Sequence, residues 1–316
     1  MLSYILFAVG FVILIKGADY LVEGSSSIAK RWGLSSIFIG LTVVAFGTSA
    51  PEFFVNIIAS IEGRSGIVAG TILGSNIVNI LLILGIAALI TPLTVNTATV
   101  SRQIPLSLLA VIVLAVLVND KFITHEPFNA LSRGDGLILI TFFVIFLYSV
   151  ASVMHQKGQE MPIKEHKRSK SLLMILGGCV LLALGGKWIV DGAVQIAQVL
   201  EIRESVVGLT IIAVGTSLPE LAASGVAAYK GKTDIAVGNV IGSNIFRIFW
   251  VLGVSALIRP VNFSDNLNFD ILAVGAATVL LLAALYTNKK RILERWEGYV
   301  FIILYILYIG FLIYRS

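Results

Sequence analysis

Two stretches of the chain place the same polar residues inside apolar segments. The first is GLTVVAFGTSAPE at residues 40–52, and the second is GLTIIAVGTSLPE at residues 208–220. Each stretch ends in a proline followed by a glutamate, Glu52 in the first and Glu220 in the second. A carboxylate within a membrane segment is costly and is a functional candidate by default. A second carboxylate at the matching position indicates that the two act together.

The hydroxyl and carboxylate groups of these stretches form a set of hard oxygen ligands. They are Thr48, Ser49 and Glu52 in the first stretch and Thr216, Ser217 and Glu220 in the second. Because the set contains no soft ligand, it suits Na⁺, Ca²⁺ or another hard cation rather than copper or zinc. Two bidentate carboxylates and two threonine oxygens supply about six of the six to eight oxygens that Ca²⁺ takes. A divalent ion would also neutralise both glutamates.

The prolines of the two stretches predict broken helices. Pro51 and Pro219 lack an N–H group and clash with the preceding turn. The carbonyl groups of Gly47 and Gly215 therefore lose their helical partners. Irregular backbone survives within a membrane only where it is buried in protein or lines a cavity. We expect each helix to divide into two half-helices with free carbonyl oxygens near mid-membrane.

A second motif follows each carboxylate at the same distance. It is Gly-Ser-Asn-Ile at residues 74–77 and again at residues 242–245. Small residues of this kind commonly serve only close helix packing. Since the motif repeats in register with the carboxylates, we expect Ser75 and Ser243 to contribute hydroxyl groups to a shared site.

Both motifs share an offset of 168 residues, which indicates an internal duplication. This offset spans five membrane segments, and an odd number makes the second half enter the membrane from the opposite side. Inverted repeats of this kind are typical of secondary transporters. We expect a first five-helix repeat at residues 1–154, a basic cytoplasmic linker at residues 155–170, and a second, inverted repeat at residues 171–316.

Composition places the chain among all-α integral membrane proteins. It is 57% hydrophobic and 13% charged, against about 25% charged residues in soluble domains. Apolar runs predict about ten spans, near residues 2–22, 34–60, 67–91, 104–119, 134–154, 171–199, 205–228, 234–258, 268–287 and 298–314. With the N-terminus outside, most Lys and Arg residues fall in inner loops, as the positive-inside rule requires. The net charge of +5 therefore orients the chain in the bilayer rather than binding nucleic acid, and both termini are expected outside.

These motifs resemble those of the calcium/cation antiporter superfamily, specifically the prokaryotic sodium/calcium exchangers. The resemblance covers nearly the whole chain and implies ten transmembrane helices around one central site, with two long helices that slide past a core of eight. It implies a Ca²⁺ site formed by Glu52, Glu220, Thr48 and Thr216 and flanking Na⁺ sites. The flanking sites would use the Ala45 and Ala213 carbonyl groups with Ser49, Ser75, Ser217 and Ser243, and Asn79 would lie in the middle of the cluster. It also implies antiport of Na⁺ and Ca²⁺ in a prokaryotic cell membrane. We expect a monomer that has no cofactor and is not an enzyme.

One position departs from the pattern of this family. The repeat partner of Asn79 is Arg247, where many members have an aspartate or an uncharged amide. A guanidinium does not deprotonate in a protein, so it cannot be a cation ligand. Arg247 either turns away from the site or points inward and pairs with Glu52 or Glu220. An attraction of about 4 kcal/mol, for charges about 4 Å apart at an effective dielectric near 20, favours the inward orientation. We therefore expect Arg247 to modify the site and its coupling.

Other functions remain open at this point. Proton- or potassium-coupled cation exchange would use the same glutamates, although a nearby Arg247 lowers a carboxylate pKa and disfavours protonation. An ion channel could be lined by the same oxygens, but it does not need matched broken helices. An intramembrane hydrolase would need a recognition element for a peptide or lipid, which no motif provides. A non-transporting ion sensor is the last alternative.

Overall fold

The computed structural model describes residues 2–97, 99–123, 125, 128–152, 154, 165–199, 213–287 and 291–315. The first half forms α1 (Leu2–Trp32), α2 (Ser36–Ile39), η1 (Gly40–Val44), α3 (Ala45–Ile61), α4 (Ser65–Ile77), η2 (Val78–Ile83), α5 (Leu84–Ile90), β1 (Leu93–Thr94), η3 (Thr99–Gln103), α6 (Ile104–Leu117), α7 (Asp120–Ile123), β2 (Ala130–Leu131) and α8 (Arg133–Ala151). The second half forms α9 (Arg168–Val199), α11 (Ala213–Thr216), α12 (Leu218–Tyr229), α13 (Thr233–Ile245), η5 (Phe246–Val251), α14 (Leu252–Ile258), β3 (Val261–Asn262), α15 (Leu267–Thr287), β4 (Ile292–Leu293) and α16 (Arg295–Arg315). Segments labelled η are π-helical turns that continue the neighbouring α-helices.

Membrane-spanning helices dominate the fold. Nine helices in the described ranges are long and apolar enough to cross a bilayer. The tenth expected span, at residues 205–228, begins outside the described residues and includes α11 and most of α12. Most of the expected linker, at residues 155–164, also lies outside them. Alpha-helices suit this environment because they satisfy their backbone hydrogen bonds internally.

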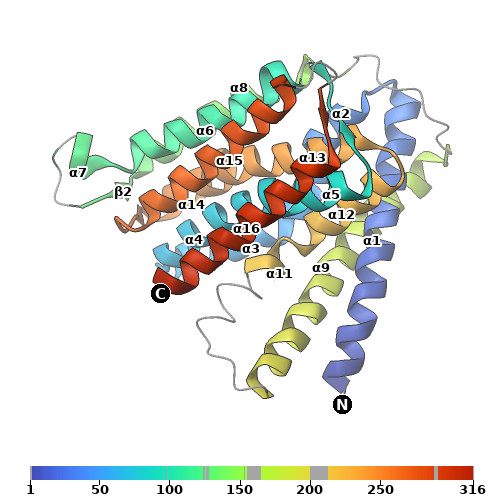
Figure 1. Cartoon of the computed structure of the whole chain (residues 1–316), viewed down its shortest axis with the longest axis horizontal. Helices are drawn as coiled ribbons and strands as arrows, with labels where there is room; N and C mark the ends of the chain where they lie inside the picture. Colours follow the sequence, from blue (N-terminus) through green and yellow to red (C-terminus); the bar gives the residue numbers. More distant parts are fainter. Residues whose placement is uncertain are drawn as a thin grey trace.

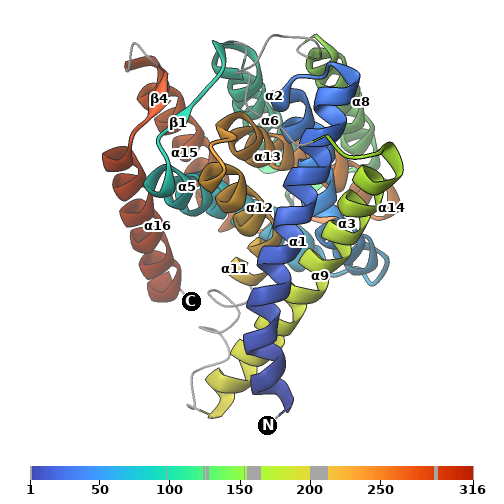
Figure 2. The ribbon, with the colours of Figure 1, turned by 90° about the vertical axis from the view of Figure 1, so that its right-hand side faces the viewer.

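Two long helices, α1 and α9, pack against each other and extend beyond the other helices (Figures 1 and 2). Their contact is lined by small residues seven positions apart, namely Gly10, Gly17 and Gly24 on α1 and Ser171, Gly178 and Gly185 on α9. A Cβ atom added to Gly178 would lie 2.8 Å from the carbonyl oxygen of Gly17, and one added to Gly185 would lie 2.8 Å from that of Gly10. Absent side chains thus bring the two backbones into direct contact, as at small-residue helix interfaces in membranes.

The two halves repeat the same order of elements. Helix α4 with η2, α5 and β1 has its counterpart 168 residues later in α13, η5, α14 and β3. Strand β1 pairs antiparallel with β4, and β2 pairs antiparallel with β3. Each ladder thus joins a strand of one half to a strand of the other. Because β1 corresponds to β3, the two ladders are equivalent under the internal symmetry.

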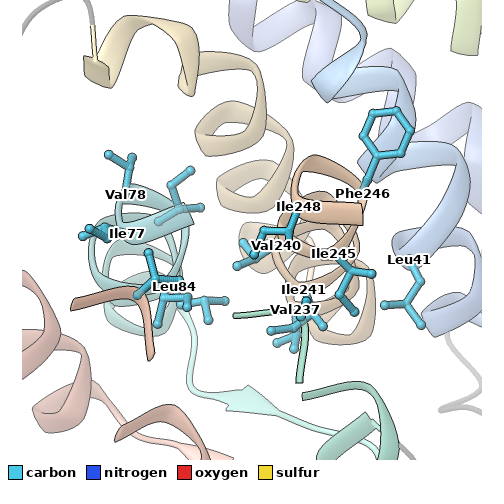
Figure 3. Close-up of a cluster of buried hydrophobic side chains, with 14 of the residues drawn as sticks. Leu41, Ile77, Val78, Leu84, Val237, Val240, Ile241, Ile245, Phe246 and Ile248 are labelled. Atoms are coloured by element: carbon cyan, nitrogen blue, oxygen red, sulfur yellow. The ribbon is translucent and has the colours of Figure 1, made fainter. Parts of the chain in front are cut away.

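Helix α13 lies at the centre of the core, and all its residues from Ile235 to Ile245 are buried. Val237, Val240 and Ile241 of α13 belong to a cluster of apolar side chains that also includes Ile77 and Leu84 of the first half (Figure 3). Burial of apolar area accounts for this packing against other helices, although it does not distinguish core from lipid as it distinguishes core from water. The packed core fixes the polar residues that α3, α12 and α13 carry.

The prolines act differently in the two halves. In the second half, α11 ends at Thr216 and α12 begins at Leu218, so the helix is interrupted beside Pro219 as expected. In the first half, α3 continues through Pro51 from Ala45 to Ile61. The expected break at Pro51 is therefore wrong, because one missing hydrogen bond does not end a helix that its neighbours hold in place. The irregular backbone of this half lies upstream, in η1.

Polar contacts join α1 to the turn between α12 and α13. Lys230, at the end of α12, forms ion pairs with Asp19 and, at 3.7 Å, with Glu23 of α1. Lys232 donates a hydrogen bond to Ser26 Oγ at 2.8 Å. A second group of contacts stays within the α1–α9 pair, where Lys30 lies 3.0 Å from Glu165. The long helices are therefore connected to the core at this end by ion pairs.

Candidate cation site

Three charged side chains from three separate elements meet in the centre of the protein. Glu52 comes from the middle of α3, Glu220 from the first turn of α12, and Arg247 from the second position of η5. Their exposed fractions are 6%, 0% and 1%. Since α3 and α12 are repeat equivalents, the inverted duplication brings the two carboxylates together.

Arg247 bridges both glutamates. Its Nε donates a hydrogen bond to Glu52 Oε2 at 2.7 Å, and its Nη2 donates one to Glu220 Oε1 at 2.6 Å. Nη2 also contacts Glu52 Oε2. The inward orientation expected for Arg247 is thus confirmed, and the side chain pairs with both acids rather than with one.

Two serines of the first half complete the hydrogen bonding of the acids. Ser75 Oγ donates to Glu52 Oε1 at 2.7 Å, and Ser49 Oγ donates to Glu220 Oε1 at 2.8 Å. Ser49 thus crosses from the first half to the carboxylate of the second. Glu220 Oε2 and Arg247 Nη1 are buried and have no hydrogen-bond partner in the described part of the chain.

The corresponding serines of the second half have different environments. Ser243 Oγ donates to the Ala45 carbonyl oxygen at 3.3 Å, so two of the expected ligands contact each other. Ser217 Oγ is buried without a hydrogen-bond partner among the described residues. Ala213 and Thr216 are the first and last residues of α11, directly before Ser217. The serines therefore surround the acids from both halves, but only those of the first half bind them.

Thr48 lies one turn before Glu52, and it contacts the other half of the protein. Its Oγ1 is 3.3 Å from the Ala45 carbonyl oxygen and 3.1 Å from Asn239 Oδ1 on α13. Thr48 is 1% exposed. A hydroxyl that can reach a neighbouring helix is also oriented toward the region between α3 and α13, where the expected ligands converge.

Asn79 is buried in η2, at the same position as Arg247 in η5. Its Nδ2 donates to Asn244 Oδ1 at 2.8 Å, and Asn244 Nδ2 donates to the Asn76 carbonyl oxygen at 3.4 Å. Within the described residues, no hydrogen bond joins Asn79 to either glutamate, and its Oδ1 has no partner. Asn79 thus links η2 to α13, and the place beside the acids belongs to Arg247.

Sequence reasoning missed a pair of supporting contacts. Asn239 Nδ2 donates to Ser224 Oγ at 2.9 Å and to the Glu220 carbonyl oxygen at 3.4 Å. In the first half, Asn56 Nδ2 donates to the Glu52 carbonyl oxygen at 2.8 Å, and Thr71 donates to Asn56 at 3.1 Å. Each helix that carries a glutamate is thus held to the next helix one turn later. The offset of 168 residues, which relates these four residues in two pairs, was the available signal.

The side chains of the site carry a net charge of −1, from two carboxylates and one guanidinium. No cluster of three or more His, Cys, Asp or Glu residues suited to a metal ion occurs in the described ranges. A cation at this site would therefore depend on two carboxylates with hydroxyl and carbonyl oxygens, which suits hard ions.

Inverted repeats around a buried pair of acids define a membrane transporter of the secondary type. The family model for "Sodium/calcium exchanger protein" matches residues 2–151 and 170–314, and the chain belongs to this family. It is 32% identical over 347 residues to the sodium/calcium exchanger MaX1 of Methanosarcina acetivorans, covering 99% of both chains. It is 39% identical to the putative antiporter CaxA of Alkalimonas amylolytica, covering 95% of both chains.

A solved structure agrees with the fold. The chain superposes on the sodium-calcium exchanger NCX_Mj, soaked with zero Na⁺ and Ca²⁺, with a TM-score of 0.84. The two are 34% identical, and the match covers 98% of each chain. The expected fold class and family are thereby confirmed.

Proposed function

We propose that the protein is a secondary active antiporter that exchanges Na⁺ for Ca²⁺ by alternating access. The observation that carries this proposal is the meeting of Glu52 and Glu220, which are buried and come from inverted repeat-equivalent helices. Membership of the sodium/calcium exchanger family supports the choice of ions.

Calcium and sodium would compete for one group of oxygens. In this proposal Glu52, Glu220, Thr48 and Thr216 bind Ca²⁺. The carbonyl groups of Ala45 and Ala213 and the hydroxyl groups of Ser49, Ser75, Ser217 and Ser243 form flanking Na⁺ sites, with Asn79 nearby. The contact of Ser243 with the Ala45 carbonyl oxygen, at 3.3 Å, supports a shared flanking site. Competition couples the ions because bare carboxylates disfavour passage through the low-dielectric interior.

The two long helices are the mobile part in this proposal. Helices α1 and α9 contact each other through backbone at their glycines, whereas the other helices of the two halves are joined by both strand ladders. Movement of the α1–α9 pair past the core would expose the site first to one side and then to the other. The repeats at 1–154 and 171–316 would supply the core symmetrically, joined by the linker at 155–170.

We further propose a prokaryotic inner membrane location, with both termini outside and the monomer as the functional unit. The grouping of basic residues supports this orientation. Lys30 contacts Glu165, Arg31 donates to the His166 carbonyl oxygen at 3.0 Å, and Lys230 contacts Asp19. Basic residues of separate loops thus meet at one end of the bundle, which the positive-inside rule assigns to the cytoplasm.

The test is ⁴⁵Ca²⁺ uptake into liposomes that contain the purified protein. An outward Na⁺ gradient should drive Ca²⁺ accumulation, and Glu52→Gln and Glu220→Gln should each abolish it. Glu62→Gln is the matched control, because Glu62 lies at the end of α3 and pairs with Arg64 at the surface. This variant should retain uptake.

The alternatives give different outcomes in the same vesicles. Uptake driven by a pH or K⁺ gradient but not by Na⁺ would replace sodium as the coupling ion. Calcium that only follows its own gradient would indicate a channel. Binding of calcium without any flux would indicate an ion sensor. Each of these three results would overturn Na⁺/Ca²⁺ exchange.

A further inference from the structure

The internal symmetry is broken at the position where charge matters most. Asn79 and Arg247 are the second residues of equivalent π-helical turns, yet one is neutral and the other is a permanent cation. Every other charged residue of the site is duplicated, since Glu52 matches Glu220. Arg247 is also among the largest fully buried side chains in the protein. A buried guanidinium therefore replaces the amide that symmetry would place beside the acids.

Arg247 occupies the oxygens that a transported ion would need. It binds Glu52 Oε2 through Nε at 2.7 Å and Glu220 Oε1 through Nη2 at 2.6 Å. Ser75 binds the second oxygen of Glu52 at 2.7 Å. Three of the four carboxylate oxygens thus already accept hydrogen bonds, and Glu220 Oε2 is the one without a partner in the described residues. A divalent ion held by both carboxylates would have to displace the guanidinium from at least one of them.

The charge balance favours the same conclusion. With Arg247 in place the site carries −1, so one monovalent cation neutralises it and a divalent ion leaves it at +1. Without the guanidinium the site would carry −2, which matches two monovalent ions or one divalent ion. Arg247 thus contributes the charge of one bound sodium ion.

We propose that Arg247 is a resident cation that substitutes for one Na⁺ in the site and competes directly with Ca²⁺ for Glu52 and Glu220. This inference rests on the proposed Na⁺/Ca²⁺ exchange. It assigns to Arg247 the role of setting ion affinity and the number of sodium ions that oppose each calcium ion.

Equilibrium binding tests the proposal without transport. Binding of ⁴⁵Ca²⁺ to the purified protein in detergent is measured at increasing Na⁺ concentration, for the unchanged protein and for Arg247→Asn. Asparagine is the residue that the first repeat has at this position. In Arg247→Asn the Ca²⁺ affinity in the absence of Na⁺ should rise by about tenfold or more, because the carboxylates keep their full double charge. The slope of log apparent Kd against log Na⁺ concentration should rise by about one, since one more Na⁺ is displaced per Ca²⁺.

Arg247→Lys is the matched control and keeps the charge. Lysine is a point charge without the planar fork of arginine, so it bridges two carboxylates less well. Its Na⁺ slope should equal that of the unchanged protein, while its Ca²⁺ affinity should lie between those of the other two. Arg247→Gln provides a second neutral variant if Arg247→Asn does not fold, and it should show the same steeper slope.

The outcomes separate the two proposals. Equal Ca²⁺ affinity and equal Na⁺ slope in the unchanged protein and in the folded neutral variant would overturn the role of Arg247 and leave Na⁺/Ca²⁺ exchange intact. Failure of all folded variants to bind Ca²⁺ would instead reject the proposed function, and this inference with it. A steeper slope in Arg247→Lys as well would show that shape rather than charge determines coupling, and would also overturn the inference.

Discussion

Arg247 and Asn79 occupy the same position of two equivalent π-helical turns but bind different partners. Arg247 spans Glu52 and Glu220, whereas Asn79 donates to Asn244 at 2.8 Å. π-Helical turns inside α-helices frequently mark functional sites. In this protein they place one amide and one guanidinium at matching positions in the core, and only the guanidinium reaches the acids.

The first prediction concerns stability in the absence of ions. Arg247→Asn leaves two buried carboxylates without their cation, and breaking a buried ion pair typically costs about 3–5 kcal/mol. Glu220→Gln should cost less, because Arg247 and Glu52 then remain as a neutral pair. Thermal unfolding in detergent should therefore rank the Tm values as unchanged protein, Glu220→Gln and Arg247→Asn, from highest to lowest.

Added calcium should reverse much of the loss in Arg247→Asn. A ligand that binds only the folded state stabilises it by about 2.7 kcal/mol at a hundredfold excess over Kd. The Tm increase on adding Ca²⁺ should be larger for Arg247→Asn than for the unchanged protein. A Tm of Arg247→Asn that does not respond to Ca²⁺ would contradict this account of the site.

The second prediction concerns the contact between α1 and α9. A Cβ atom at Gly178 would lie 2.8 Å from both Gly17 O and Leu21 N, so Gly178→Ala forces the backbones apart. Overpacking of this kind costs about 1–3 kcal/mol. The adjacent Gly177 is the matched control, because a Cβ atom there meets nothing within 4 Å. Thermal unfolding should show a loss of stability for Gly178→Ala and none for Gly177→Ala.

The third prediction concerns the connection between α1 and the core. Lys230→Ala removes the ion pairs with Asp19 and Glu23, which join the α1–α9 pair to the end of α12. It should change the maximal rate of Na⁺-driven Ca²⁺ uptake while leaving Ca²⁺ affinity unchanged, because the lysine lies away from the acids. Lys30→Ala removes a contact within the moving pair, with Glu165 at 3.0 Å, and should leave both quantities unchanged. Equal rates in Lys230→Ala and the unchanged protein would show that these ion pairs do not limit movement.

The fourth prediction concerns the titration of Lys232. Burial, with a smaller contribution from the Lys230 charge, lowers the pKa of Lys232 from 10.5 to about 8. Between these two values the unfolded chain binds more protons than the folded one, so the contribution of Lys232 to stability increases as pH rises through this window. After reductive ¹³C-methylation, its NMR signal should titrate near pH 8, and the signal missing from Lys232→Arg assigns it. A midpoint near that of an ordinary lysine would contradict the burial of this amine.

The sequence was sufficient for the architecture and for the acids, because both follow from hydropathy and from one repeated offset. The inward position of Arg247 followed from charge alone, since a cation near two buried acids is attracted to them. Its pairing with both acids at once did not follow, because that depends on the relative placement of η5, α3 and α12. The uninterrupted α3 was missed for a similar reason. Proline removes one hydrogen bond, and the packing around it decides whether the helix ends.

The supporting contacts of Asn239 and Asn56 were also beyond sequence reasoning. Hydropathy indicates which residues lie in the membrane but not which face of a helix meets its neighbour. The seven-residue spacing of Gly10, Gly17 and Gly24 is visible in the sequence. Its meaning required the structure, which places Gly178 and Gly185 of a helix more than 150 positions later directly against them.

The two short strand ladders restrict how the protein can change shape. Strand β1 is joined to β4 and β2 to β3, so the chain halves are tied to each other twice, and the ladder of β2 lies beside α7, away from the end that carries β1 and β4 (Figures 1 and 2). Hinged separation of the halves would have to break backbone hydrogen bonds in at least one ladder. Helices α1 and α9 belong to neither ladder. A rigid frame with one free pair of helices therefore has a single inexpensive displacement, and gradients of ions would act on that displacement alone.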